Sequence, residues 1–211
     1  MISSSNYKNI ITQTQKYVKK YMNSYNDISH DYNHIYEVVK LSLIIAKKEK
    51  IKNKRDLFHI KMGALLHDIA DSKYVKNNSQ YKVINLFLSS LKNLNKTDKK
   101  EILKISTNTS LSKDNKINFN KKNIKLYIVQ DADRINSLGS IGIMRYISYN
   151  IKNKKKSSFT EIIDTMKNRT NKIKQFLKTK TAKNISIKHF KLINSFINNY
   201  KNFIIMHKYQ I

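Results

Sequence analysis

The sequence predicts an all-α fold, and three observations support this. The chain has no proline, it has three glycines in 211 residues, and its apolar residues recur at helical spacing. Proline and glycine are the residues that interrupt helices most strongly, so their scarcity leaves long segments that can stay helical. A chain of this length with 40% hydrophobic residues can build one sizeable core. We therefore expect a single helical domain over residues 1–211.

Apolar periodicity and capping residues divide the chain into expected helices. Asp56 is the expected N-cap of the third helix, which carries the segment Gly63–Asp71, and Thr97 is the expected cap of a short fifth helix with Glu101 as its capping-box partner. A polar loop is expected over 107–120 and a basic linker over 152–158. The other helices are expected at 7–23, 32–48, 79–94, 121–137, 159–178 and 186–206.

Composition excludes several classes of protein. The chain has no cysteine, which rules out disulfides and thiolate metal sites. Its longest apolar runs, such as Leu41–Ala46, are too short to cross a bilayer, so no membrane partner is expected. The segment Met1–Ser5 lacks the basic start and apolar stretch of a secretory signal, and a cytoplasmic location is expected.

The net charge of +28 has two explanations. A functional one is a polyanionic partner such as a nucleotide, a nucleic acid or an anionic surface. The other is codon bias, because Lys, Asn and Ile are all abundant together and the lysines spread along the whole chain. The sequence leaves both open, although a positive field attracts a nucleotide in either case.

Two segments place acids and histidines where core residues are expected. The run Gly63–Asp71 is apolar until the adjacent His67 and Asp68, with Asp71 three residues further on; taken alone, it also fits a helix end with a surface histidine. Asp131 and Asp133 lie in an otherwise apolar run, where buried carboxylates need a cation or strong donors. Histidine and carboxylate without thiolate suit Mn²⁺, Fe²⁺, Mg²⁺ or Zn²⁺.

Three motifs together resemble the HD superfamily of metal-dependent phosphohydrolases. The segment His30–Val38 resembles its HD-x-x-H-x-x-x-V start, and Ala64–Ile69 resembles its ALLHDI core. The segment Gln130–Ile143 resembles the QDADRLDAIGAIGI run of a bacterial subgroup whose members look like nucleoside-triphosphate pyrophosphohydrolases. The resemblance extends over about 15–205 and implies an HD-domain helical bundle, with a core over about 25–150 and additional C-terminal helices over about 158–206.

The resemblance also implies roles for individual residues. Four of them are the implied ligands of one divalent ion, with Mn²⁺ as the first expectation: His34, His67, Asp68 and Asp133. Asp133 is preferred to Asp131, which is expected to contact the ligands from behind. Asp71 matches a catalytic carboxylate, which would orient the attacking water or protonate the leaving group.

Further residues are candidates for substrate binding, each with an ordinary structural role as its alternative. Lys73, Arg134 and Arg145 are expected to neutralise phosphate charge, and His30 is either a helix-start residue or a substrate contact. The chain also departs from the subgroup. Asn136 and Ser137 replace its usual Asp-Ala, and the basic stretch 152–156 replaces a Gly-rich one, which leaves substrate preference in doubt.

The expected function is hydrolysis of nucleotides, with release of pyrophosphate from (d)NTPs as the first expectation. A nucleoside-monophosphate phosphatase and an alarmone hydrolase share the same ligand set and stay open as alternatives. The third alternative is a non-catalytic basic protein that binds nucleic acid. It is disfavoured because all four ligands are present and because basic and aromatic residues do not alternate as in base-stacking surfaces. The sequence does not determine the oligomeric state.

Overall fold

The computed structural model describes residues 4–24, 31–71, 79–116, 123–154 and 158–208, and within these ranges the secondary structure is helical. The all-α prediction is therefore confirmed. The elements are α1 (Ser4–Asn23), α2 (Tyr32–Lys48), α3 (Lys54–Leu66), α4 (Ser79–Ser90), α5 (Lys96–Thr107), the 3₁₀ helix η2 (Leu111–Lys116), α6 (Ile124–Asn136), α7 (Gly139–Lys154), α8 (Phe159–Phe176) and α9 (Lys180–Lys208). No helix among the described residues is both long and apolar enough to cross a membrane.

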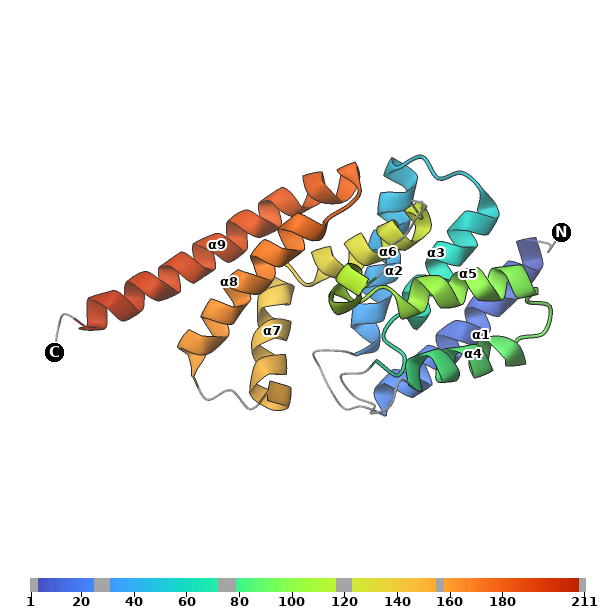
Figure 1. The fold of residues 1–211 in the computed structure, drawn as a ribbon, viewed down its shortest axis with the longest axis horizontal. Coiled ribbons are helices and arrows are strands. Elements are labelled where there is room, and N and C mark those ends of the chain that lie inside the picture. The colour runs from blue at the N-terminus through green and yellow to red at the C-terminus, as the bar shows by residue number, and fades with distance from the viewer. Residues whose placement is uncertain (1–3, 25–30, 72–78, 117–122, 155–157, 209–211) are drawn as a thin grey trace.

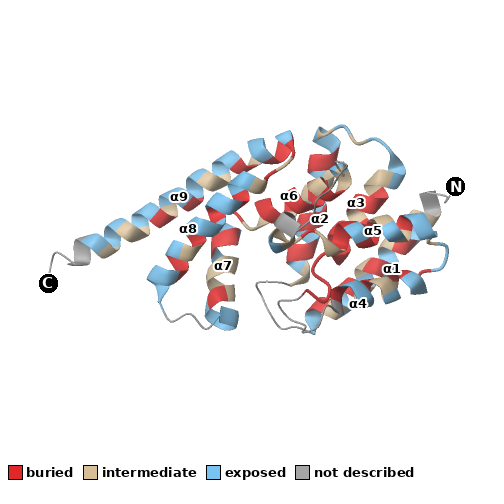
Figure 2. Cartoon of the chain, viewed as in Figure 1, coloured by how far each residue is buried: buried red, intermediate tan, exposed pale blue. Residues whose placement is uncertain are grey.

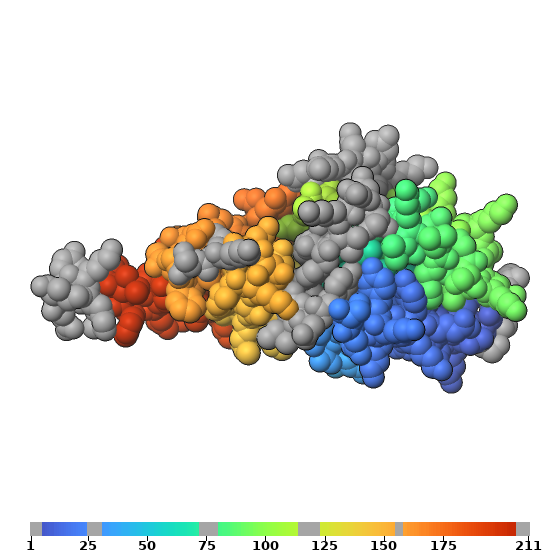
Figure 3. Space-filling model, turned by 90° about the horizontal axis from the view of Figure 1, so that it is seen from below, coloured from blue at the N-terminus to red at the C-terminus, as the bar shows by residue number. Residues whose placement is uncertain are grey.

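The helices form two groups that lie side by side along the long axis of the molecule (Figure 1). Helix α3 packs against α1, α2, α5 and α6, while α7 and α8 pack against the long helix α9. Buried residues concentrate where these helices face one another (Figure 2). The space-filling view shows α8 and α9 at one end of the molecule and α1 and α5 at the other (Figure 3).

Each group has its own apolar cluster. The larger one joins helices α1 to α6 and also includes Leu177, which follows α8, and Ala182, which lies in the first turn of α9. The smaller one joins α7, α8 and α9, and its buried members are Leu138, Ile143, Ile163, Met166, Ile173, Ile193 and Ile197. The single-domain organisation stays a prediction, because two adjacent cores are compatible with one domain or with a domain and an appendage.

Several helix boundaries differ from the expected ones for local reasons. Asn53, not Asp56, caps α3 and accepts hydrogen bonds from the backbone of Arg55 (2.8 Å) and Asp56 (3.2 Å). Likewise Asn95, not Thr97, caps α5 and accepts from the N–H of Asp98 at 2.8 Å. Asparagine is as good an N-cap as aspartate and a better one than threonine. The capping residue nearest the apolar run is therefore not always the residue that caps the helix.

Larger differences occur in the second half of the chain. Helix α7 was not predicted, and it continues through Lys152–Lys154, where a basic linker was expected. The expected loop over 107–120 contains η2. Helix α9 begins at Lys180, six residues earlier than expected. The two glycines of α7 obscure its helical pattern in the sequence, because glycine is about 1 kcal/mol less favourable than alanine inside a helix.

The three glycines stand where a side chain has no room. A Cβ on Gly63 would overlap the side chain of Ile105 across the contact between α3 and α5. A Cβ on Gly142 would overlap the backbone of Ser137, and Gly139 has a φ of +71°, which glycine adopts at no steric cost. In a chain so poor in glycine, these positions fix the approach of α3 to α5 and the turn from α6 into α7.

A charged network is buried between α3 and α5, away from the HD motif. Asp98 is fully buried, and its Oδ1 accepts from Arg55 Nε at 2.6 Å and lies 2.7 Å from His59 Nε2. Burial would raise the pKa of Asp98, but the hydrogen bonds from Arg55 and His59 outweigh it and lower that pKa below 3.8. Burial lowers the pKa of His59 below 6.5, against the pull of Asp98.

We expect this network to make the fold sensitive to acid. Both groups bind fewer protons in the folded than in the unfolded chain, so stability is lost as the pH falls, first from about 6.5 through the folded pKa of His59 and then below about 3.8 for Asp98. Urea unfolding at about pH 7 and about pH 5 should show a smaller loss for His59→Gln than for the wild type. Equal losses in the two proteins would contradict this assignment.

Candidate metal centre

Four of the predicted residues come together from two helices, α2 and α6, and from the turn that follows α3. His34 lies in the first turn of α2, where its N–H donates to the side chain of the capping residue Asp31 at 3.0 Å. His67 is the C-cap of α3, and Asp68 follows in the turn. Asp133 lies in the last turn of α6. The HD pair is therefore placed just beyond the helix that was expected to carry it.

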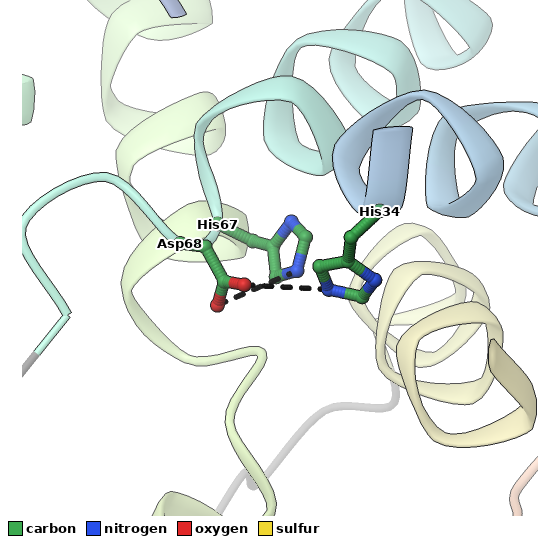
Figure 4. A group of neighbouring side chains, drawn as sticks. All are labelled: His34, His67 and Asp68. Atoms are coloured by element: carbon green, nitrogen blue, oxygen red, sulfur yellow. Dashed lines mark ion pairs between the residues drawn. The ribbon is translucent and has the colours of Figure 1, made fainter. Parts of the chain in front are cut away.

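The imidazoles of His34 and His67 and the carboxylate of Asp68 point toward one another (Figure 4). Nε2 of His34 lies 3.3 Å from Asp68 Oδ2 and 3.4 Å from Asp133 Oδ1. Nε2 of His67 lies 3.6 Å from Asp68 Oδ1 and 3.6 Å from Asp133 Oδ1. One potential ligand atom from each of His34, His67 and Asp68 falls within 4.8 Å of the others.

These separations fit a shared ion. Two ligand atoms that each bind one ion at about 2.0–2.2 Å are about 2.8–3.6 Å apart, for bond angles between about 90° and 110°. The observed distances of 3.3–3.6 Å lie in the upper part of this range. They are too long for good N–H···O hydrogen bonds, which centre on about 2.9–3.0 Å. Nε2 of His67 is buried and makes no hydrogen bond to the described part of the chain.

The other nitrogen of each imidazole is held by the protein. Nδ1 of His67 lies 2.8 Å from the carbonyl oxygen of Ala64, which can only accept, so Nδ1 carries the proton. Nδ1 of His34 lies 2.7 Å from Asn136 Oδ1, which also accepts from Arg145 Nη1 at 2.7 Å. In the neutral ring of His67, Nε2 is then the nitrogen with a free lone pair, as metal binding requires.

Electrostatics ties the four groups together. Burial would lower the pKa of His67, but Asp68 and Asp133 outweigh it and raise that pKa to about 9. Burial would raise the pKa of Asp133, but the imidazoles of His34 and His67 beside its carboxylate lower it well below 3.8. The carboxylate of Asp133 is thus kept ionised by nearby positive charge. A proton on His67 supplies part of that charge, and a divalent cation at the same place would supply more.

Two residues that the sequence predicts at the site instead make contacts to the C-terminal helices. Asp131 is two positions from Asp133, about 200° around the helix, so it faces away from the cluster. Its carboxylate accepts from the N–H groups of Lys178 (3.0 Å) and Thr179 (2.7 Å) at the start of α9. Arg134 is 1% exposed and donates to the carbonyl oxygen of Phe176 at 2.6 Å. Asp131 therefore does not contact the ligands from behind, and Arg134 is not placed to bind phosphate.

Asn136 supports the cluster in a way that the sequence did not show. In the sequence, Asn136 stands out only as a departure from the subgroup, yet its amide oxygen contacts both His34 Nδ1 and Arg145 Nη1. Arg145, a predicted phosphate ligand, has its Nη1 2.7 Å from His34 Nδ1. A sequence pattern cannot pair positions 34, 136 and 145, because only the packing of α2 against the α6–α7 turn brings them together.

The remaining predictions have different outcomes. Asp71 is buried, 3% exposed, and its N–H donates to the carbonyl oxygen of Asp68 at 3.4 Å. Its catalytic role stays a prediction. His30 and Lys73 lie outside the described residues.

A cavity of about 420 Å³ opens beside the cluster. Asp133, whose side chain is 25% exposed, lines it, whereas the side chains of His34 and His67 are 2% exposed. The volume is typical of a small-molecule site. This cavity therefore reaches the cluster on the side of Asp133.

Comparison with known proteins shows the family to which this chain belongs. The family profile for the HD domain matches residues 31–138, a little more than half of the chain. The chain belongs to the HD domain family. That span contains all four residues of the cluster, and three of them, His34, His67 and Asp68, could hold one divalent metal ion. No curated protein matches the sequence.

Solved structures resemble the chain over nearly its whole length. An HD-superfamily hydrolase from Bacillus thuringiensis is 26% identical, with a TM-score of 0.68 over 92% of this chain and 96% of that one. The Lin1889 protein from Listeria innocua is 26% identical, with a TM-score of 0.71 over 92% and 95%. YpgQ from Bacillus subtilis, solved in complex with ADP, is 21% identical, with a TM-score of 0.71 over 92% and 97%.

Metal binding can be tested directly. We expect the wild type to bind Mn²⁺, and His67→Gln or Asp133→Asn to bind it at least about 10-fold more weakly, because each variant removes a candidate ligand. His59→Gln is the matched control, since it alters a buried histidine outside the cluster. Calorimetric titration of the four proteins measures this. Equal Mn²⁺ affinity in His67→Gln and His59→Gln would contradict the ligand assignment.

Proposed function

We propose that this protein is a metal-dependent phosphohydrolase of nucleotides, which cleaves (d)NTPs to monophosphate and pyrophosphate. One observation carries the proposal: two imidazoles and two carboxylates converge at 3.3–3.6 Å beside an accessible cavity. Membership of the HD domain family and the resemblance to an HD-superfamily hydrolase support the reaction class. The ADP held by the structurally similar YpgQ supports a nucleotide as substrate.

The residues that would hold the metal are His34, His67, Asp68 and Asp133. When bound, a divalent ion lowers the pKa of a water ligand and polarises a phosphoryl oxygen. Mn²⁺ is the proposed ion among Mn²⁺, Fe²⁺, Mg²⁺ and Zn²⁺, all of which suit a ligand set with only nitrogen and oxygen donors. The carbonyl oxygen of Ala64 accepts from Nδ1 of His67, so Nε2 of that ring stays available, and Asn136 and Arg145 position the ring of His34 through its Nδ1.

Two residues near the cluster have proposed roles of their own. Asp71 is buried and follows Asp68 by three residues. Its carboxylate would accept a proton from the attacking water or orient that water. Arg145 lines the cavity, and burial lowers its pKa while Asp133 and Asp68 raise it. An arginine stays charged despite such a shift, so it can neutralise a phosphate oxygen beside Asp133.

Product analysis tests the reaction. With Mn²⁺, we expect dNTPs or NTPs to yield monophosphate and pyrophosphate, resolved by ion-exchange chromatography, and Asp68→Ala to yield neither. Monophosphates and alarmones belong in the same panel, because their hydrolysis would instead indicate the two alternative activities. Nucleic-acid binding that survives Asp68→Ala, without any nucleotide turnover, would replace the proposal with a binding function.

The role of Asp71 has a separate test. We expect Asp71→Asn to lower kcat by about 10²–10⁴-fold, because the amide cannot accept the proton of the water, with Mn²⁺ affinity unchanged. Initial rates and Mn²⁺ titration of the same preparation measure both quantities. Loss of Mn²⁺ binding in this variant would show that Asp71 positions the ligands and does not act on the water.

A further inference from the structure

The cavity beside Asp133 is lined by cations from two C-terminal helices. Arg145 and Lys154 reach it from α7, and Arg169 and Lys172 reach it from α8. Asp133 is the one acidic residue among the described residues that line it. Because the charge of Asp133 is countered by the imidazoles of His34 and His67, the cavity keeps a strong positive potential.

Aromatic rings hold the two α8 cations. The guanidinium of Arg169 lies 5.8 Å from the centre of the Tyr146 ring, and Tyr146 also lines the cavity. Lys172 Nζ lies 5.9 Å from the centre of the Phe176 ring. Such contacts place a cation without neutralising it. Within the described part of the chain, neither residue has a carboxylate within ion-pair distance, so both charges are available to an anion.

The cations also repel one another. The positive charge of Arg169 is close enough to Arg145 to contribute to the lowering of its pKa, after the larger effect of burial. Gathering like charges around one cavity is unfavourable unless an anion binds there. A single phosphate bound by Arg145, beside Asp133, would leave Arg169 and Lys172 of α8 without an anionic partner. The arrangement therefore fits a chain of linked phosphates.

General lysine abundance does not account for this placement. Helix α8 also carries Lys167 and Lys174, which are exposed and do not line the cavity. Arg169 and Lys172 are three positions apart and share one face of the helix, whereas Lys167 and Lys174 are each about 200° away from the nearer of the two. The chain therefore provides matched pairs of cations that differ in position and not in net charge.

We propose that Lys154, Arg169 and Lys172 form a subsite for the phosphates beyond the one attacked at the metal centre, which makes nucleoside triphosphates the substrate class. This assignment rests on the proposed function. The water oxygen forms a bond to the α-phosphorus, and the bond from that phosphorus to the bridging oxygen of the β-phosphate breaks. The electron pair stays on that oxygen, so pyrophosphate leaves with increased negative charge beside the three cations. One water proton goes to pyrophosphate and the other to solvent.

Binding of inorganic tripolyphosphate to the metal-free protein tests the subsite without any turnover. We expect the wild type to bind tripolyphosphate more tightly than orthophosphate, and the double variant Arg169→Gln/Lys172→Gln to lose at least about 10-fold in tripolyphosphate affinity. The control Lys167→Gln/Lys174→Gln should stay within about twofold of the wild type. Calorimetry at fixed, near-physiological salt measures all of these. Equal weakening in the two double variants would attribute binding to overall charge and overturn the proposal.

Kinetics with a dNTP gives the second readout. The double variant Arg169→Gln/Lys172→Gln should lose at least about 10-fold in kcat/KM. Its Mn²⁺ affinity and thermal stability should match those of the control Lys167→Gln/Lys174→Gln. Unchanged kcat/KM in a protein that does hydrolyse dNTPs would overturn the subsite and leave the proposed function standing. If no nucleotide is hydrolysed at all, the proposed function fails, and tripolyphosphate binding still decides whether the subsite exists.

Discussion

The burial of two imidazoles beside two carboxylates is the constraint on which the rest of the site depends. Ionised groups removed from water need compensation, and His34, His67, Asp68 and Asp133 compensate one another at distances longer than good hydrogen bonds. The raised pKa of His67 and the lowered pKa of Asp133 express the same coupling from its two sides. Under the proposed ligand set, a divalent cation would satisfy all four groups at once, which a proton cannot do.

Helix α6 connects this cluster to the C-terminal helices. Asp133 on one side of α6 faces the cluster, while Asp131 on the other side binds the N–H groups that begin α9. Arg134 adds a hydrogen bond to the last residue of α8. Because these contacts are buried, they fix where α8 and α9 lie relative to the cluster. The cations of α8 are thereby held on the same cavity as Asp133.

The positive charge of the chain gains a more specific meaning from this arrangement. The sequence left codon bias and an anionic partner open, since lysine occurs throughout. The structure separates lysines that only add to the overall field, such as Lys167, from Arg169 and Lys172, which line the cavity. Codon bias and a selected anion subsite can therefore both apply, to different residues of one helix.

The sequence alone determined the helical class and three motifs that place the four clustered residues, because helix propensity, apolar periodicity and motif spacing are local properties. It did not determine α7, because two glycines weaken the local signal there even though packing makes the segment helical. Only the tertiary structure assigned Asp131 and Arg134 to the anchoring of α8 and α9, Asn136 to His34, and Arg169 and Lys172 to the cavity. Each of those roles depends on a partner far away in the chain, and distances between helices are set by packing that no local pattern records.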